Sequence, residues 1–385
     1  MNIKSIEAFA IDLTPHPKTK PRAPSRAKDI HRPIYRYDRF LQKRVAALPE
    51  SWMRVACVVT ADDGTYGLGV SLHSGPVLSI ITDHYAKILV GENCMATEKL
   101  WDTMVRASVQ YGIGGLVSHA ISAVDLALWD LKGKLLKCPV YELLGGPQKE
   151  RIFCYATGFD TEWYLELGFK ATKLFTRWGP DQGEAGIRQN IDMVAQARET
   201  VGSDVALMLD GWMAHSVEGI VRLAEALRPY NLRWVEEYLM PDQLSAYAAV
   251  RHRLPWQTLA SGEHWYLGAV YDVVEQRLVD ILQPDILWGG GLTWGVKLCH
   301  LAEMAGLEVI PHAGMNTPYG QHLVYAMPAC TWGERSESVS APGVPLEEMV
   351  VLPGTPVIKD GYLIPNNAPG FGLEVTREWL SKKAV

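Results

Sequence analysis

Apolar residues recur in short, evenly spaced runs through the second half of the chain, and each run ends at a polar residue. These polar residues are Asp210, Glu236, Glu263, Asp285 and His312. They are separated by steps of 26, 27, 22 and 27 residues, about the length of one strand, one loop and one helix. The pattern predicts repeated strand–helix units with a polar side chain at the C-terminal end of each parallel strand, as in a β/α barrel.

The first half of the chain shows a different pattern. Alternating apolar and polar residues predict a strand over 3–13, and residues 52–60 and 65–72 predict a hairpin around Asp62-Asp63-Gly64. Helices are expected near 77–90, 97–107 and 117–137. The last has apolar residues around most of its surface, so we expect it to be buried. Before the barrel, therefore, the sequence predicts a separate α+β unit.

Residues 14–50 interrupt this pattern with repeated prolines and ten Lys and Arg residues. A solvated loop is the commoner fate of such a segment. The functional alternative is a lid that brings cationic groups to an anionic substrate, with Arg44 and His31 as candidates. A nucleic-acid-binding arm is disfavoured because the whole chain carries a net charge of −6.

Composition narrows the class of protein further. The 385 residues can bury a large core or two domains, and 48% hydrophobic with 21% charged residues is typical of globular proteins. Six scattered cysteines without a CxxC pair favour reduced thiols in a cytoplasmic protein. No apolar run approaches the ~20 residues of a membrane span. We therefore expect neither nucleic acid nor membrane as a partner.

The strand-end carboxylates suggest a metal site. Taken singly, Asp210, Glu236 and Glu263 would more often be helix caps or ion-pair partners. At near-constant spacing they would converge at one end of a barrel, where hard oxygen ligands suit Mg²⁺. Either glutamate of Glu236-Glu237 could face inward. The 26-residue step from Asp210 favours Glu236, with Glu237 as its supporting neighbour.

Two further strand ends suggest acid–base chemistry. His312 needs an orienting carboxylate to act as a strong base, and Asp285, one strand earlier, could supply it. Glu334 follows 22 residues after His312 and could donate a proton or hydrogen bond to an enolic oxygen. His264 and Trp212 are candidates for binding substrate, although aromatic residues beside strand ends are as often packing residues.

These residues carry a family resemblance that covers nearly the whole chain. The carboxylate ladder, the Asp285 and His312 pair and the segments at 122–134 (SAVDLALWDLKGK) and 139–146 (PVYELLGG) resemble the mandelate racemase subgroup of the enolase superfamily. Within that subgroup, the segments at 155–158 (YATG), 207–213 (LMLDGWM) and 261–264 (SGEH) are most similar to the L-rhamnonate dehydratases.

The resemblance implies an α/β fold, a modified TIM barrel of the (β/α)₇β type. It places an N-terminal α+β capping domain at 1–128 with a substrate-covering loop near 14–50, the barrel at 129–350, and a C-terminal segment at 351–385 that returns to the capping domain. It further implies an even-numbered homo-oligomer, such as an octamer. For the site it implies Mg²⁺ at Asp210, Glu236 and Glu263, with His312 as base, Asp285 tuning it and Glu334 near the substrate oxygen. Lys173 is a further catalytic candidate, and the candidates for substrate binding are Arg44, His31, His264 and Trp212.

One departure from the racemase pattern bears on the reaction. The racemases carry Lys-x-Lys on the second barrel strand, whereas this chain reads Lys173-Leu174-Phe175. A racemase needs a base on each face of the α-carbon, so dehydration by one histidine is favoured, and Lys173 is left to bind the substrate carboxylate. We therefore expect a Mg²⁺-dependent acid-sugar dehydratase that removes the C2 proton and eliminates the C3 hydroxyl, giving a 2-keto-3-deoxy acid.

Three alternatives stay open. The substrate could be another aldonic acid, such as lyxonate or mannonate, because residues 14–50 match the family poorly. The chain could be an epimerase or racemase of the same superfamily. Least favoured is a catalytically silent barrel, since fold alone does not fix function.

Overall fold

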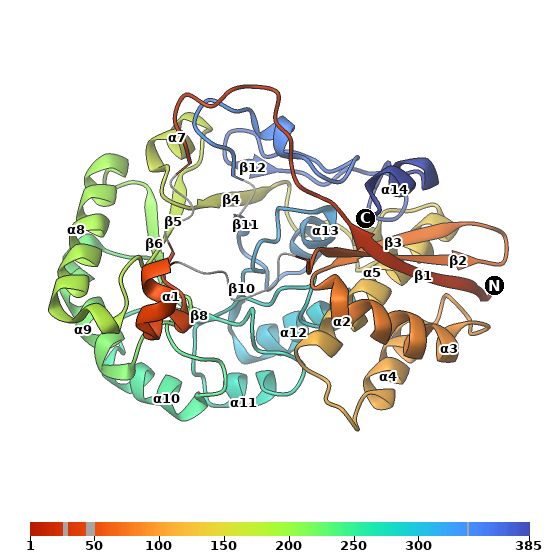
Figure 1. The fold of residues 1–385 in the computed structure, drawn as a ribbon, viewed down its shortest axis with the longest axis horizontal. Helices are drawn as coiled ribbons and strands as arrows, with labels where there is room; N and C mark the ends of the chain where they lie inside the picture. Colours follow the sequence, from red (N-terminus) through yellow and green to blue (C-terminus); the bar gives the residue numbers. More distant parts are fainter. Residues whose placement is uncertain (26–29, 44–50, 337–338) are drawn as a thin grey trace.

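The computed structural model describes residues 1–25, 30–43, 51–336 and 339–385, and an antiparallel α+β unit stands beside a parallel barrel (Figure 1). The α+β unit contains β1 (Ile3–Ile11), β2 (Arg54–Ala61) and β3 (Tyr66–Ser71), paired in that order. The predicted strand and hairpin are therefore confirmed. Its helical side includes α2 (Ser74–Ser79), α3 (Ala86–Leu89), α4 (Thr97–Ala107) and α5 (Leu116–Leu136).

Helix α5 joins the two parts of the molecule. It packs closely on β3 because two glycines of that strand lack side chains: a Cβ at Gly67 or Gly69 would overlap the α5 backbone. Apolar residues surround α5 on nearly every side, as predicted, and both large core clusters include residues from it. The helix also runs without interruption across the predicted domain limit at 128. The exact limits 1–128, 129–350 and 351–385 stay predictions.

The barrel consists of parallel strands in the order β10-β9-β8-β7-β6-β5-β4-β11. A parallel bridge between Val309 and Cys330 joins β10 to the segment entering β11 and brings the two ends of the sheet together. This architecture and its outer helices confirm the predicted modified TIM barrel. The strands are β4 (Ile152–Thr157), β5 (Ala171–Phe175), β6 (Ala206–Asp210), β7 (Val235–Glu236), β8 (Leu259–Ser261), β9 (Ile281–Leu282), β10 (Glu308–Val309) and β11 (Gly333–Arg335).

Helices surround this sheet on its outer side (Figure 1). Each lies after a strand and contributes buried apolar residues to the main core cluster, as in other β/α barrels. They are α7 (Thr161–Glu166), α8 (Gly183–Val201), α9 (Val217–Leu227), α10 (Leu244–Arg253), α11 (Val270–Glu275), α12 (Gly291–Ala305) and α13 (Pro318–Ala326).

The inside of the barrel is divided into an apolar floor and a polar layer. One side chain from each of seven strands or strand ends forms the floor, namely Tyr155, Ala171, Met208, Trp234, Ala260, Ile281 and Ile310. Side chains two residues apart on a strand face the same way. The residues two positions after the floor residues therefore also point into the barrel and form a polar layer above the floor. This layer contains Lys173, Asp210, Glu236, Gln283 and His312.

The C-terminal segment returns to the N-terminal sheet, as predicted. Strand β12 (Tyr362–Leu363) pairs antiparallel with β4, and α14 (Arg377–Lys383) then lies beside β1 (Figure 1). The backbone N–H of Val385 donates to the carbonyl of Ala10 at 3.1 Å. All six cysteines are free thiols, as expected. No helix within the described ranges is long and apolar enough to cross a membrane.

Candidate active site

Lys173 lies at the centre of a buried group of carboxylates. Its Nζ pairs with Glu236 Oε1, and it lies 2.9 Å from Glu334 Oε1 and 3.5 Å from Asp210 Oδ2. Strand register explains the grouping, because Asp210 pairs directly with Glu236 across β6 and β7. Burial and the neighbouring carboxylates raise the pKa of Asp210 well above its usual value, although Lys173 opposes them. The carboxylates outweigh the effect of burial on Lys173, so its pKa is raised and it stays charged.

Glu236 is held by neutral donors as well as by Lys173. Its Oε2 accepts hydrogen bonds from Trp234 Nε1 at 2.8 Å and from Gln283 Nε2 at 2.7 Å. Trp234 belongs to the apolar floor, so one side chain both fills the barrel and fixes a carboxylate. Trp234 and Gln283 were not among the predicted site residues. Trp234 and Gln283 each precede a predicted site residue, Glu236 and Asp285 respectively, by two positions. This spacing on a strand could have indicated that they face the same side.

Glu237, Glu263 and His264 form a second group on the neighbouring strands. Within the described part of the chain they are the one set of three His, Cys, Asp or Glu residues whose ligand atoms all lie within 4.8 Å of one another. His264 Nδ1 is 2.5 Å from Glu237 Oε1 and 3.4 Å from Glu263 Oε1. Burial disfavours the charged ring, but these carboxylates raise the pKa of His264 to about 9. Burial, followed by the charge of Glu237, raises the pKa of Glu263 to about 8.

These two groups fit a divalent cation. Burial and the neighbouring carboxylates raise the pKa values of Asp210 and Glu263, so a cation bound between them would favour their ionised forms. Glu237 Oε2 is buried and has no hydrogen-bond partner among the residues that the structure describes. Oxygen ligands of this kind suit Mg²⁺ better than a soft metal. Glu237 thus lies within the carboxylate group, whereas the sequence indicated only a supporting neighbour. Its φ of 41° ends the strand alternation, so its side chain does not point away from Glu236 as it would in a regular strand.

The predicted histidine–aspartate pair is formed. His312 Nδ1 lies 2.9 Å from Asp285 Oδ2, and His312 Nε2 lies 3.3 Å from Glu263 Oε2. Burial opposes protonation, but the charge of Glu263 and the hydrogen bond to Asp285 raise the pKa of His312 well above its usual value. With Nδ1 bound to Asp285, Nε2 is the nitrogen that can exchange a proton with a ligand.

Glu334 is completely buried, and both its oxygens are occupied. Oε1 accepts from Thr157 Oγ1 at 2.5 Å, and Oε2 accepts from the backbone N–H of Ala313 at 2.8 Å. Burial alone would raise its pKa, but Lys173, His312 and these hydrogen bonds lower the pKa to about 2. The lowered pKa favours the ionised side chain, which is a partner for Lys173. The catalytic role expected for Glu334 stays a prediction.

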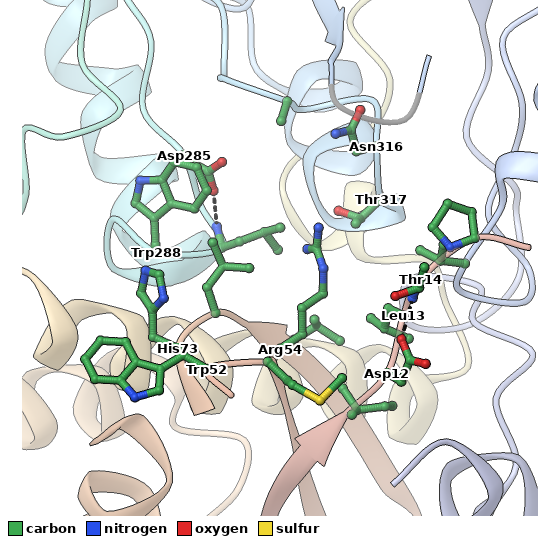
Figure 2. A pocket seen from close by; sticks show the side chains of 18 of the residues that line it. Asp12, Leu13, Thr14, Trp52, Arg54, His73, Asp285, Trp288, Asn316 and Thr317 are labelled. Atoms are coloured by element: carbon green, nitrogen blue, oxygen red, sulfur yellow. Dashed lines mark hydrogen bonds between the residues drawn. The ribbon is translucent and has the colours of Figure 1, made fainter. Parts of the chain in front are cut away.

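A cavity of about 360 Å³ opens onto these groups. Asp210, Glu263 and His312 line it from the barrel, while His73 and His119 line it from the capping side. Burial lowers the pKa of His73 and lowers that of His119 to about 3, which favours the neutral form of both rings. His73 also lines a second cavity of about 520 Å³, where Figure 2 shows it near Trp52, with Arg54 beyond them and Asp285 and Trp288 opposite. The two cavities share four lining residues, namely Leu72, His73, Trp288 and His312.

The remaining predicted substrate contacts lie in different places. Trp212 and His264 both line the 360 Å³ cavity. His31 is buried, only 2% exposed, and is not among the residues lining that cavity; its neighbour Arg32 is. Arg44 falls outside the described residues. Sequence reasoning did not single out Arg32, because nothing local distinguished it from the nine other Lys and Arg residues of 14–50.

Comparisons with known proteins agree with this architecture. Residues 50–145 match the family of the mandelate racemase / muconate lactonizing enzyme N-terminal domain, and residues 160–379 match the enolase C-terminal domain-like family. The L-rhamnonate dehydratase of Saccharopolyspora erythraea is 39% identical over 324 residues, which cover 83% of this chain and 82% of that protein.

Solved structures give the same result over nearly full lengths. The rhamnonate dehydratase from Gibberella zeae complexed with Mg superposes with a TM-score of 0.90 at 31% identity, covering 100% of this chain and 96% of that one. The 3,6-anhydro-D-galactonate cycloisomerase from Zobellia galactanivorans has a TM-score of 0.79 at 28% identity, with 100% of both chains covered. The chain thus belongs to the mandelate racemase / muconate lactonizing enzyme family of the enolase superfamily.

Proposed function

We propose that this protein is a Mg²⁺-dependent acid-sugar dehydratase, a hydro-lyase, and that L-rhamnonate is its substrate. The observation that carries the reaction is that His312, paired with Asp285, faces the same cavity as the carboxylates of Asp210 and Glu263. A base and an anionic oxygen cluster at one cavity suit proton abstraction next to a carboxylate. The substrate assignment is supported by the relatives named L-rhamnonate dehydratase.

Asp210, Glu236 and Glu263 are the proposed Mg²⁺ ligands. Glu237, with its unpartnered buried oxygen, is the neighbour that completes or supports this set. The bound ion would act as a Lewis acid on the substrate carboxylate and make the C2 proton more acidic. Lys173 remains charged beside this centre and would bind the same carboxylate or its developing charge.

The protein's own groups then handle the proton. Asp285 accepts from His312 Nδ1 and orients the ring, so Nε2 removes the proton from C2. The resulting imidazolium is stabilised by Asp285 and Glu263 and can return the proton to the departing C3 hydroxyl. Glu334 holds Lys173 in place from the other side. Water leaves, and tautomerisation gives the 2-keto-3-deoxy acid.

A library of aldonic acids tests this assignment. With Mg²⁺ present, the purified protein should convert L-rhamnonate to a product detected by a 2-keto-3-deoxy acid assay, with lyxonate and mannonate as the competing substrates. Product from another acid alone would correct the substrate and keep the reaction class. Absence of both product and C2-proton exchange in D₂O across the library would favour the silent-barrel alternative.

The cellular setting is proposed at a coarser level. We propose a small anionic sugar acid as the partner molecule, an even-numbered homo-oligomer such as an octamer, and a cytoplasmic location. The net charge of −6 and the free thiols support the last of these. Light scattering in solution would measure the assembly directly.

A further inference from the structure

His31 anchors the segment at residues 30–43, called the covering segment below, to the barrel. Its backbone N–H donates to the carbonyl of Thr176 at 3.1 Å, just beyond the end of β5. Its ring occupies a slot at Gly179, where a Cβ would overlap the imidazole, and lies 4.0 Å from Asp181. The ring also meets Tyr35 edge-on, with the centroids 5.7 Å apart. These contacts fix the backbone at residue 31 before any substrate binds.

That anchor places the next residue, Arg32, at the cavity. The Arg32 guanidinium carbon lies 5.1 Å from the centroid of the Trp212 ring. Trp212 is itself held, because its backbone N–H donates to Asp210 Oδ1 at 2.8 Å and its φ of 40° turns the chain out of β6. A guanidinium over an indole ring is held by a cation–π attraction. Arg32 is therefore positioned from both the covering segment and the barrel.

Arg32 differs from every other described residue that lines this cavity. It is the one Lys or Arg in the lining, and its guanidinium forms no hydrogen bond or ion pair with another described residue. Its backbone carbonyl accepts from the N–H of Tyr35 at 2.9 Å. Lys173, by contrast, contacts three carboxylates. The guanidinium consequently retains its five N–H donors for a ligand.

We infer that Arg32 is a substrate-binding residue that recognises hydroxyl groups in the tail of the acid, beyond C3; this inference rests on the proposed dehydratase function. The carboxylate end is assigned to the ion site and Lys173, deep in the barrel, whereas Arg32 enters from the covering segment above Trp212. A planar fork of donors matches two neighbouring hydroxyl oxygens. His31 and Trp212 act through Arg32 as positioning residues.

The central experiment combines two variants with two substrates. Arg32→Met and Arg32→Lys would be assayed on L-rhamnonate and on a four-carbon aldonic acid of the same C2 and C3 configuration. For Arg32→Met we expect KM for the six-carbon acid to rise about 10- to 100-fold, the usual effect of losing hydrogen bonds to a charged group. kcat should change little, and KM for the four-carbon acid should stay within about threefold. Arg36→Met, at an exposed position on the same segment, is the matched control and should leave both substrates unaffected.

Gly179→Ala tests the positioning role. The added methyl group would displace the His31 ring, so this variant should raise KM in the same selective way while Arg32 is intact. Circular dichroism and Tm would verify that each variant is folded. The Arg32→Lys variant keeps the charge without the fork and should fall between wild type and Arg32→Met.

The outcomes separate this inference from the proposed function. Equal rises in KM for both acids would place Arg32 at the carboxylate and overturn the assignment to the tail. Unchanged KM values for both acids would also overturn that assignment. Calorimetric titration with L-rhamnonate measures binding without turnover. If the wild type binds the acid without dehydrating it, the proposed reaction fails while the affinity of Arg32→Met still decides the present inference. Equal binding by wild type and Arg32→Met would overturn it.

Discussion

The barrel wall and the covering segment face the same cavity but hold their side chains in different ways. On the wall, Asp210, Glu236 and Lys173 are each at most 2% exposed and are fixed by strand register and charge. On the covering segment, one buried imidazole and one cation–π contact fix Arg32. Groups with several constraints keep their geometry when one contact is lost, whereas lightly held groups do not. The difference suggests that the wall carries the reaction and the covering segment carries selectivity.

The largest expected effect is loss of the metal or of one proposed ligand. Exhaustive chelation with EDTA, or Asp210→Asn or Glu263→Gln, should lower kcat/KM for every acid by more than about 100-fold, the upper range for loss of an outer-sphere partner of a metal ligand. Activity and Mg²⁺ affinity by calorimetry would be measured, with Glu184→Gln as an exposed acidic control. Full turnover in metal-free buffer would contradict the proposed reaction. A loss of activity confined to six-carbon acids would show that the barrel wall also acts on selectivity, as is proposed for Arg32.

His312 should come next. His312→Asn removes the proposed base and should reduce C2-proton exchange in D₂O by about 10²- to 10⁴-fold, the usual contribution of general base catalysis. Asp285→Asn should lose less, since the imidazole would remain but be poorly oriented. The exposed His300→Asn is the control. Wild-type exchange rates in the His312 variant would reassign the base, with Lys173 as the first replacement.

Lys173→Met should have a large effect on stability. Removing this ammonium leaves Asp210, Glu236 and Glu334 buried without their common cation, which costs about 3–5 kcal/mol for a buried ion pair broken on one side. Urea unfolding would measure the loss of unfolding free energy. The control is Lys170→Met, at the exposed position just before β5. We expect Mg²⁺ to stabilise the variant more than the wild type. Equal stability of both proteins without metal would show that Lys173 does not balance these charges.

The smallest expected signal concerns stereochemistry. Phe175 lies at the end of β5 and lines the cavity, at the position where the family resemblance places a second lysine in the racemases. We therefore expect the base, His312, to act on one face of the substrate. The elimination should then be syn. L-rhamnonate recovered from D₂O at partial conversion should contain no C2 epimer by NMR. Accumulation of that epimer would require a base on both faces and would favour the epimerase alternative.

The sequence by itself determined the fold class and most of the polar side chains that point into the barrel. Strand residues two apart face the same side, so a floor residue such as Trp234 already implies that Glu236 points into the barrel. Repeated strand-end positions likewise bring Asp285 and His312 within hydrogen-bond distance, because parallel strands align their carboxyl ends. These relations depend only on local periodicity and on one general architecture.

Only the tertiary structure decided how side chains from unrelated segments meet. The φ of Glu237 breaks the strand alternation and turns it toward His264, and Glu334 is ionised because Lys173 and a backbone N–H from another loop reach it. Arg32 lines the cavity in place of His31 because a glycine slot on the barrel accepts the imidazole. Such approaches depend on distances between elements far apart in sequence, which local patterns do not encode.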